Sequence, residues 1–152
     1  MKITAQKINT FTMFKLPSAF ICGVRVKYLD DEKCVVSVKH NWLNKNPFRS
    51  MFWAVQGMAA ELATGALVIK KIRESGQSIS MLVANNNATF TKKATGRITF
   101  ACKNGNQLDQ VIDQAIATGE GQTIWMSATG VNEQDIVVST FNFEWTLKLK
   151  NK

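Results

Sequence analysis

The sequence predicts an α+β fold in which one long central helix is wrapped by a curved antiparallel sheet of six strands. The segment 47–72 has helical periodicity with apolar residues nearly all the way round, which is typical of a buried helix. Other segments alternate as strands do, and short turns join them, which favours antiparallel pairing. The 152 residues contain no internal repeat and no linker, so we expect a single domain over residues 1–152.

The first elements follow from local signals. We expect a helix over residues 4–15, because Thr4 can cap its start and Pro17 follows its end. Residues 21–29 and 33–40 alternate between apolar and polar side chains, which predicts two half-buried strands. The acidic turn at residues 30–32 joins these strands into a hairpin.

The central helix is predicted over about residues 48–72. Pro47 suits the first helical position, and Asn46 suits the capping position before it. Gly76 ends the helical region, since glycine readily adopts the left-handed conformation that often follows a helix.

The remainder of the chain is predicted to be mainly strands, over residues 78–91, 95–103, 120–131 and 135–150. Asn85, Asn86 and Asn87 interrupt the first of these strands, and we expect a bulge or a similar irregularity there. A short amphipathic helix precedes Gly119, which closes it. Its apolar stripe consists of Leu108, Val111, Ile112, Ala115 and Ile116.

Composition excludes several classes of function. The net charge is +8, but the basic residues are scattered without a run of five, so we expect a solvated basic face and no nucleic-acid partner. The longest uncharged stretch, residues 75–91, is too polar to span a bilayer. We expect no membrane insertion, no signal peptide and a cytoplasmic location. The three cysteines form no CxxC pair and His40 is the only histidine, so we expect no metal.

Glu61 is the most informative single residue. It is the only acidic residue between Glu32 and Glu74, and it lies in the middle of the predicted helix. We expect it to be buried, where an ionised carboxylate is costly unless it is paired, protonated or used, and where burial raises its pKa. No Lys or Arg lies three or four positions away to pair with it. The structural alternative is an ion pair with another strand or with a partner subunit.

The segment HNWLNKNPFRSMFWAVQGMAAELATG, from His40 to Gly65, resembles the loop and central helix of the hotdog thioesterase superfamily. Within that superfamily the chain most resembles the DUF4442 branch, which is similar to PaaI-type thioesterases. The resemblance implies a hotdog fold and hydrolysis of an acyl-CoA or acyl-carrier thioester. It also implies a homodimer or homotetramer with the site between two protomers, and no cofactor besides the coenzyme A of the substrate.

The resemblance implies that Glu61 acts as a base or nucleophile. From the residues themselves, Asn46 would orient substrate or water besides capping the helix. The backbone N–H groups of Ser50 and Met51, at the predicted helix start, would stabilise a thioester oxygen. The predicted substrate-lining residues are Phe48, Gly57 and Thr64, and the predicted phosphate contacts are Lys92, Lys93, Lys70 and Lys71. The segment 46–51 contains no glycine, which favours the alternative of a non-catalytic module that binds an acyl-CoA or a lipid-like ligand.

Overall fold

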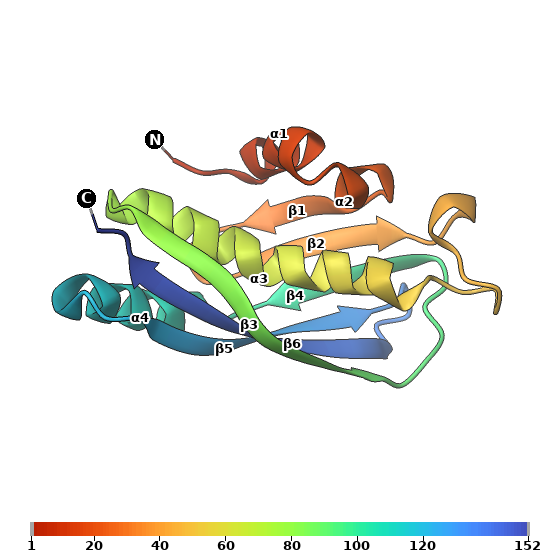
Figure 1. The fold of residues 1–152 in the computed structure, drawn as a ribbon. Helices are drawn as coiled ribbons and strands as arrows, with labels where there is room; N and C mark the ends of the chain where they lie inside the picture. The colour runs from red at the N-terminus through yellow and green to blue at the C-terminus, as the bar shows by residue number, and fades with distance from the viewer. Residues whose placement is uncertain (1, 152) are drawn as a thin grey trace.

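A computed structural model describes residues 2–151 and shows one long helix, α3 (Trp53–Ser75), against a curved six-stranded antiparallel sheet (Figure 1). The strand order is β1-β2-β4-β5-β6-β3. The strands are β1 (Arg25–Leu29), β2 (Cys34–Lys39), β3 (Ile79–Phe90), β4 (Arg97–Cys102), β5 (Gln122–Val131) and β6 (Val137–Leu149). The predicted fold class is therefore confirmed.

The N-terminal segment forms two helices instead of the single one predicted. α1 (Ala5–Lys15) begins as expected, because the hydroxyl of Thr4 accepts a hydrogen bond from the amide of Lys7. Pro17 ends that helix but also opens a second one, α2 (Pro17–Ile21), since proline is well accepted at a first helical position. The strand predicted from residue 21 consequently starts only at Arg25.

The prediction that α3 begins near residue 48 with Asn46 as its cap is wrong. The side-chain oxygen of Asn46 accepts hydrogen bonds from the amides of Phe48 and Ser50, at 2.9 and 3.2 Å, and so closes a turn within the loop. Arg49 has a φ of 60°, which lies outside the helical region. The loop also contains a short 3-10 helix (Trp42–Asn44), and α3 starts only at Trp53.

Three other predicted features are present. Gly76 and Gly119 both have a φ of 69° and end α3 and α4 (Gly105–Thr118) in the left-handed conformation. The pairing of β3 with β6 shifts register between Val83 and Asn85, at the start of the asparagine run.

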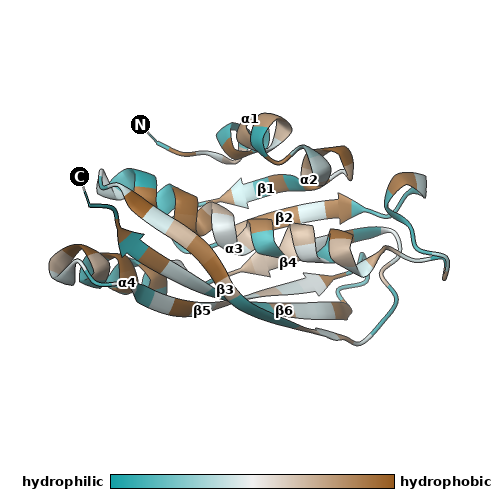
Figure 2. Ribbon diagram, in the orientation of Figure 1, coloured by the Kyte–Doolittle hydropathy of each residue, from teal (hydrophilic) through white to brown (hydrophobic). Residues whose placement is uncertain are grey.

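The core lies between α3 and the concave face of the sheet. Hydrophobic and hydrophilic residues alternate along the strands and around α3 (Figure 2). The buried apolar side chains form one cluster, whose larger members include Leu67, Phe100 and Phe141. Burying this apolar area supplies the main driving force that fixes α3 in the curve of the sheet.

Two lysines near the end of α3 are buried and paired. The ammonium of Lys70 contacts the carboxylates of Asp31, in the β1–β2 turn, and Glu74, one helical turn further on. The ammonium of Lys71 lies 2.7 Å from a carboxylate oxygen of Asp109 on α4. These pairs attach the C-terminal part of α3 to its neighbours.

The helices α1 and α2 are attached to the edge of the sheet beside β1 (Figure 1). The Asn9 side chain donates to the carbonyl of Val26 and accepts from its amide, at 2.9 and 2.8 Å. The Arg25 guanidinium donates to the carbonyl of Phe20 at 2.7 Å. This anchorage holds α1 close to α3 without closing the space between them.

Candidate functional site

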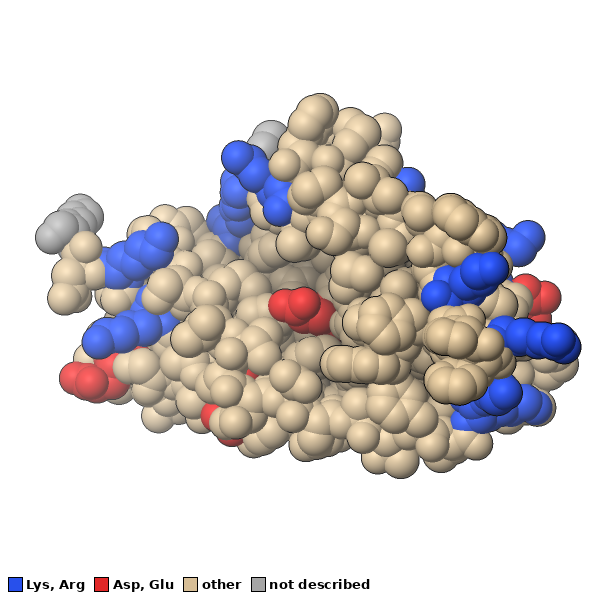
Figure 3. All heavy atoms as spheres, turned by 45° about the vertical axis from the view of Figure 1, so that its right-hand side comes forward, with Lys and Arg blue, Asp and Glu red and all other residues tan. Residues whose placement is uncertain are grey.

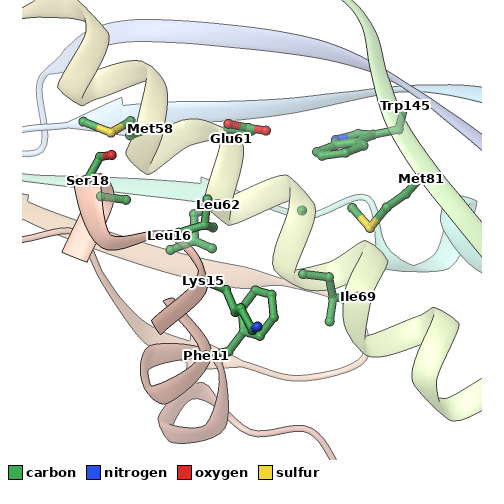
Figure 4. Close-up of a pocket in the computed structure, with 12 residues that line it drawn as sticks. Phe11, Lys15, Leu16, Ser18, Met58, Glu61, Leu62, Ile69, Met81 and Trp145 are labelled. Atoms are coloured by element: carbon green, nitrogen blue, oxygen red, sulfur yellow. The ribbon is translucent and has the colours of Figure 1, made fainter. Parts of the chain in front are cut away.

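A cleft of about 360 Å³ separates the N-terminal helices from α3, and Glu61 lies on its α3 wall (Figure 4). Most of the lining is apolar. The N-terminal wall includes Phe11, Leu16 and Ala19, and the α3 wall includes Met58, Leu62 and Ile69. Glu61 is exposed in the single chain, so the prediction that it is buried is wrong. Its face of α3 turns away from the sheet and toward helices that only partly cover it.

The surroundings of Glu61 favour its neutral form. Desolvation by its apolar neighbours raises the pKa of the Glu61 carboxyl above its ordinary value. No ion pair among residues 2–151 involves Glu61, although Lys15 also lines the cleft. Figure 3 shows an isolated acidic group in a hollow of uncharged surface, with Lys and Arg gathered around the periphery. Within residues 2–151, therefore, the structural alternative of an ion pair between Glu61 and another strand is not realised.

The far end of the cleft is fixed by a buried hydrogen-bond chain. The indole N–H of Trp145 donates to the Thr64 hydroxyl at 2.9 Å, and that hydroxyl donates to the carbonyl of Glu61 at 2.9 Å. Thr64 thus lies behind the cleft, where it orients Trp145, instead of lining the cleft as predicted. Gly65 does line it, and a Cβ there would lie 3.3 Å from the Trp145 ring.

Gly57, predicted to line the site with Glu61, lies elsewhere. The position that its Cβ would occupy is 3.4 Å from the Phe141 ring, so Gly57 faces β6 and lines neither the cleft nor the hollow at the start of α3. The stripe that faces the cleft contains Met58, Glu61, Gly65 and Ile69, at helical spacings of three or four. This spacing is visible in the sequence and could have identified the α3 wall.

Six of the remaining predicted residues gather in a second hollow, of about 500 Å³, at the start of α3. It is lined by Asn46, Phe48, Ser50, Met51, Lys92 and Lys93, among others. Glu61 is not among its lining residues. Trp53, which lines the hollow, precedes Glu61 by two helical turns, or roughly 12 Å along the axis. The Glu61 cleft and the hollow at the start of α3 are therefore two separate spaces within one chain.

The amides that were expected to stabilise an oxyanion are already used. The amide of Ser50 donates to the Asn46 side chain at 3.2 Å, and that of Met51 donates to the carbonyl of Ala94 at 2.8 Å. Within residues 2–151, the amides of Trp53 and Ala54 have no acceptor. Free donors are expected in the first turn of a helix, so these two amides are the ones available to a ligand.

The four lysines predicted to contact phosphate fall into two groups. Lys92 and Lys93 line the hollow at the start of α3, and the Lys93 ammonium donates to the carbonyl of Phe48 at 3.2 Å. Lys70 and Lys71 lie near the other end of α3, buried and ion-paired, and line neither the Glu61 cleft nor the hollow at the start of α3.

Sequence reasoning did not identify the residues that complete the cleft. Phe11 and Lys15 come from α1, Met81 from β3 and Trp145 from β6. Within residues 2–151, no group of three or more His, Cys, Asp or Glu side chains is arranged to hold a metal. No helix in that range combines the length and apolarity that a membrane span requires.

The family described as "Domain of unknown function (DUF4442)" matches residues 4–147. No curated protein matches the chain. A protein of unknown function from Pseudomonas aeruginosa, described as a probable thioesterase, is 20% identical with a TM-score of 0.86, over 99% of both chains. A P. aeruginosa thioesterase mutant is 14% identical with a TM-score of 0.76, over 99% of this chain and 97% of that one. A Staphylococcus aureus thioesterase mutant is 17% identical with a TM-score of 0.64, over 82% and 93%. These similarities confirm the hotdog fold.

Proposed function

From the premise that the chain belongs to the DUF4442 family, we propose that it is a thioesterase that hydrolyses acyl-CoA or acyl-carrier thioesters at a site shared by two protomers. One observation carries the proposal: the unpaired carboxylate of Glu61 lies in an apolar cleft that raises its pKa. A carboxylate with a raised pKa is a better general base near neutral pH.

In the proposed reaction, Glu61 takes a proton from a water molecule as that water attacks the thioester carbonyl carbon. The carbon–oxygen bond forms, and the negative charge moves to the former carbonyl oxygen. When this intermediate collapses, the carbon–sulfur bond breaks and the leaving thiolate takes up the proton. The products are a carboxylic acid and a free thiol. Direct attack by Glu61 on the carbonyl carbon is the variant in which an anhydride forms first.

The oxyanion needs donors that Glu61 cannot supply. The free amides of Trp53 and Ala54 lie roughly two helical turns from Glu61 in the same chain, too far to act on one carbonyl group. A second copy of the chain would bring its own α3 start against the Glu61 cleft. Phe48, Trp53 and Phe90, which are 68%, 57% and 48% exposed, surround the start of α3 and offer an apolar surface for that contact.

The S. aureus thioesterase has a residue spacing that matches the spacing of Asn46 and Glu61. A glutamine and a glutamate that lie 15 residues apart in that protein have each been substituted by alanine. Asn46 and Glu61 are also 15 residues apart in this chain. Asn46 shapes the loop before α3 through its hydrogen bonds to Phe48 and Ser50, and its amide group lines the hollow that the substrate would enter.

The second candidate is a module that binds an acyl-CoA or a lipid-like ligand without cleaving it. The segment 46–51 favours this reading, because it contains no glycine and its Ser50 and Met51 amides are engaged within the loop. The two functions differ in one measurable respect, which is the release of thiol.

The test is thiol release from a panel of acyl-CoAs by the wild type and by Glu61→Gln. The glutamine keeps the size of the side chain but cannot accept the proton, so turnover should fall by about a hundredfold or more. Glu120→Gln is the matched control, because Glu120 is exposed and lines neither the Glu61 cleft nor the hollow at the start of α3. Binding without thiol release in the wild type would establish the second candidate. Unchanged turnover in Glu61→Gln together with a large loss of melting temperature would make Glu61 a structural residue.

A further inference from the structure

The cleft at Glu61 is bordered by Phe11 of α1 and Ile69 of α3, which project from opposite walls (Figure 4). A third hollow, of about 250 Å³, lies beyond this pair and is lined by the same two residues, together with Ile3, Ile8, Lys7 and Arg73. Because they line both spaces, Phe11 and Ile69 form the partition between them. The space between α1 and α3 is therefore a long groove with a constriction.

The groove is elongated along α3. From Glu61 to Ile69 the helix advances by roughly 12 Å. An extended chain advances by about 1.2 Å per bond, so this length accommodates about ten bonds. The apolar lining combines aliphatic side chains, among them Leu62, Ile69 and Met81, with the rings of Phe11 and Trp145. This shape and lining suit an unbranched hydrocarbon chain better than a compact ring.

The wall opposite Glu61 is held in place independently of any ligand. Asn9 ties α1 to Val26 of β1, and the amide of Val24 donates to the carbonyl of Ala19 at 3.0 Å. Both attachments lead to the edge of the sheet. The groove is therefore preformed, which lowers the entropic cost of binding a flexible chain.

We infer that the groove beside Glu61 binds a linear aliphatic acyl chain and that Phe11 and Ile69 set the length of chain it accepts. This inference rests on the proposed function, because it assigns the acyl part of the same thioester. The carbonyl carbon lies at Glu61, and the chain runs along α3 toward the constriction. Removing the Phe11 ring joins the two hollows and admits a longer chain, whereas enlarging Ile69 shortens the accepted chain.

The experiment measures dissociation constants for saturated acyl-CoAs from hexanoyl to hexadecanoyl and for phenylacetyl-CoA, in a Glu61→Gln background in which turnover is slowed. Affinity should rise by about fourfold for each methylene that enters the groove, and then stop rising near a chain of about ten carbons. Phe11→Ala should move this limit to longer chains, and Ile69→Phe should move it to shorter ones. Phe14→Ala is the matched control, since Phe14 is on the same helix, is 71% exposed and lines neither hollow.

Each outcome decides the inference. Tighter binding of phenylacetyl-CoA than of the saturated chains, or a length limit that none of the variants moves, would overturn it. If Phe11→Ala does not fold, Ile69→Phe alone must still shorten the limit, and an unchanged limit in that variant is also a refutation. Thiol release by the wild type is scored separately. If thiol release depends on Glu61 but no variant moves the limit on acyl chain length, only this inference is rejected. If the variants move the limit on chain length but the wild type releases no thiol, only the proposed thioesterase activity is rejected.

Discussion

Lys70 offers a test of how buried charge stabilises this fold. Its side chain is 2% exposed, whereas those of its partners Asp31 and Glu74 are 75% and 35% exposed. Burial lowers the pKa of Lys70, but the hydrogen bonds and charges of Asp31 and Glu74 outweigh it, and the net shift is upward. The carboxylates can return to water when the pair is broken, but the ammonium of Lys70 cannot do so as easily.

Two perturbations of this pair should therefore differ. The double variant Asp31→Asn/Glu74→Gln strands a buried ammonium and should lower the free energy of unfolding by about 3 kcal/mol. We take the lower end of the usual range because water reaches the Asp31 side. Lys70→Met keeps the buried stem and removes the charge, so its free energy of unfolding should stay within about 1 kcal/mol of the wild type.

Urea denaturation measures both changes. With a slope of about 2 kcal/mol per molar, the double variant should lose about 1.5 M in midpoint, whereas Lys70→Met should shift little. The pKa of Lys70 is raised and that of Asp31 is lowered, the latter first by its hydrogen bond to Lys70. The stabilisation should therefore be present between about pH 4 and pH 10, and be lost below and above that window. Equal losses in the two variants would refute the reasoning.

Five other predictions follow from the site. Lys92→Gln/Lys93→Gln should weaken acyl-CoA binding and reduce its dependence on salt, whereas a salt-insensitive wild type would exclude phosphate recognition. Because the pKa of Glu61 is raised, thioester turnover should appear as pH rises through a midpoint above the usual glutamate range, and a midpoint below pH 4 in a pH–rate profile would contradict this. The same shift means that the folded state loses stability as pH rises through the raised pKa, so the loss should be smaller in Glu61→Gln. Thr64→Val leaves the buried indole N–H of Trp145 without its acceptor and should lower the free energy of unfolding by about 1–3 kcal/mol. An unchanged melting temperature in thermal unfolding would contradict this and would mean that water replaces the hydroxyl. Light scattering at micromolar concentration should show a dimer or tetramer, and a monomer would remove the shared site.

The sequence identified the elements of the fold better than their ends. Gly76 gave the correct end of α3, because a left-handed residue after a helix is a local property. Asn46 and Pro47 form an equally good local signal for a helix start, but Asn46 bonds within the loop and Arg49 leaves the helical region. The bridge between Lys45 and Met51 stabilises that loop, and this contact is not encoded by capping preferences.

The candidate site was predictable only in part, because it depends on contacts between distant segments. The absence of a local partner for Glu61 is visible in the sequence, and no ion pair within residues 2–151 involves this residue. Its exposure depends on how far α1 stands from α3, which Asn9 and Val26 determine across the edge of the sheet. Helical periodicity cannot show this, because it reports which face is apolar and not what covers that face.

The attachment of Asn9 to β1 also affects how the sheet can grow. Its side chain occupies the outward-facing amide and carbonyl of Val26, in one of the two edge strands of the described sheet. The other edge, β3, carries no such cover and presents Leu82 and the asparagine run to solvent. A further strand can therefore pair with the sheet at the β3 edge, whereas Asn9 obstructs pairing at the β1 edge. Two copies that joined through β3 would each turn an obstructed edge outward, so extension of the sheet would end with the pair and would not continue into a fibre.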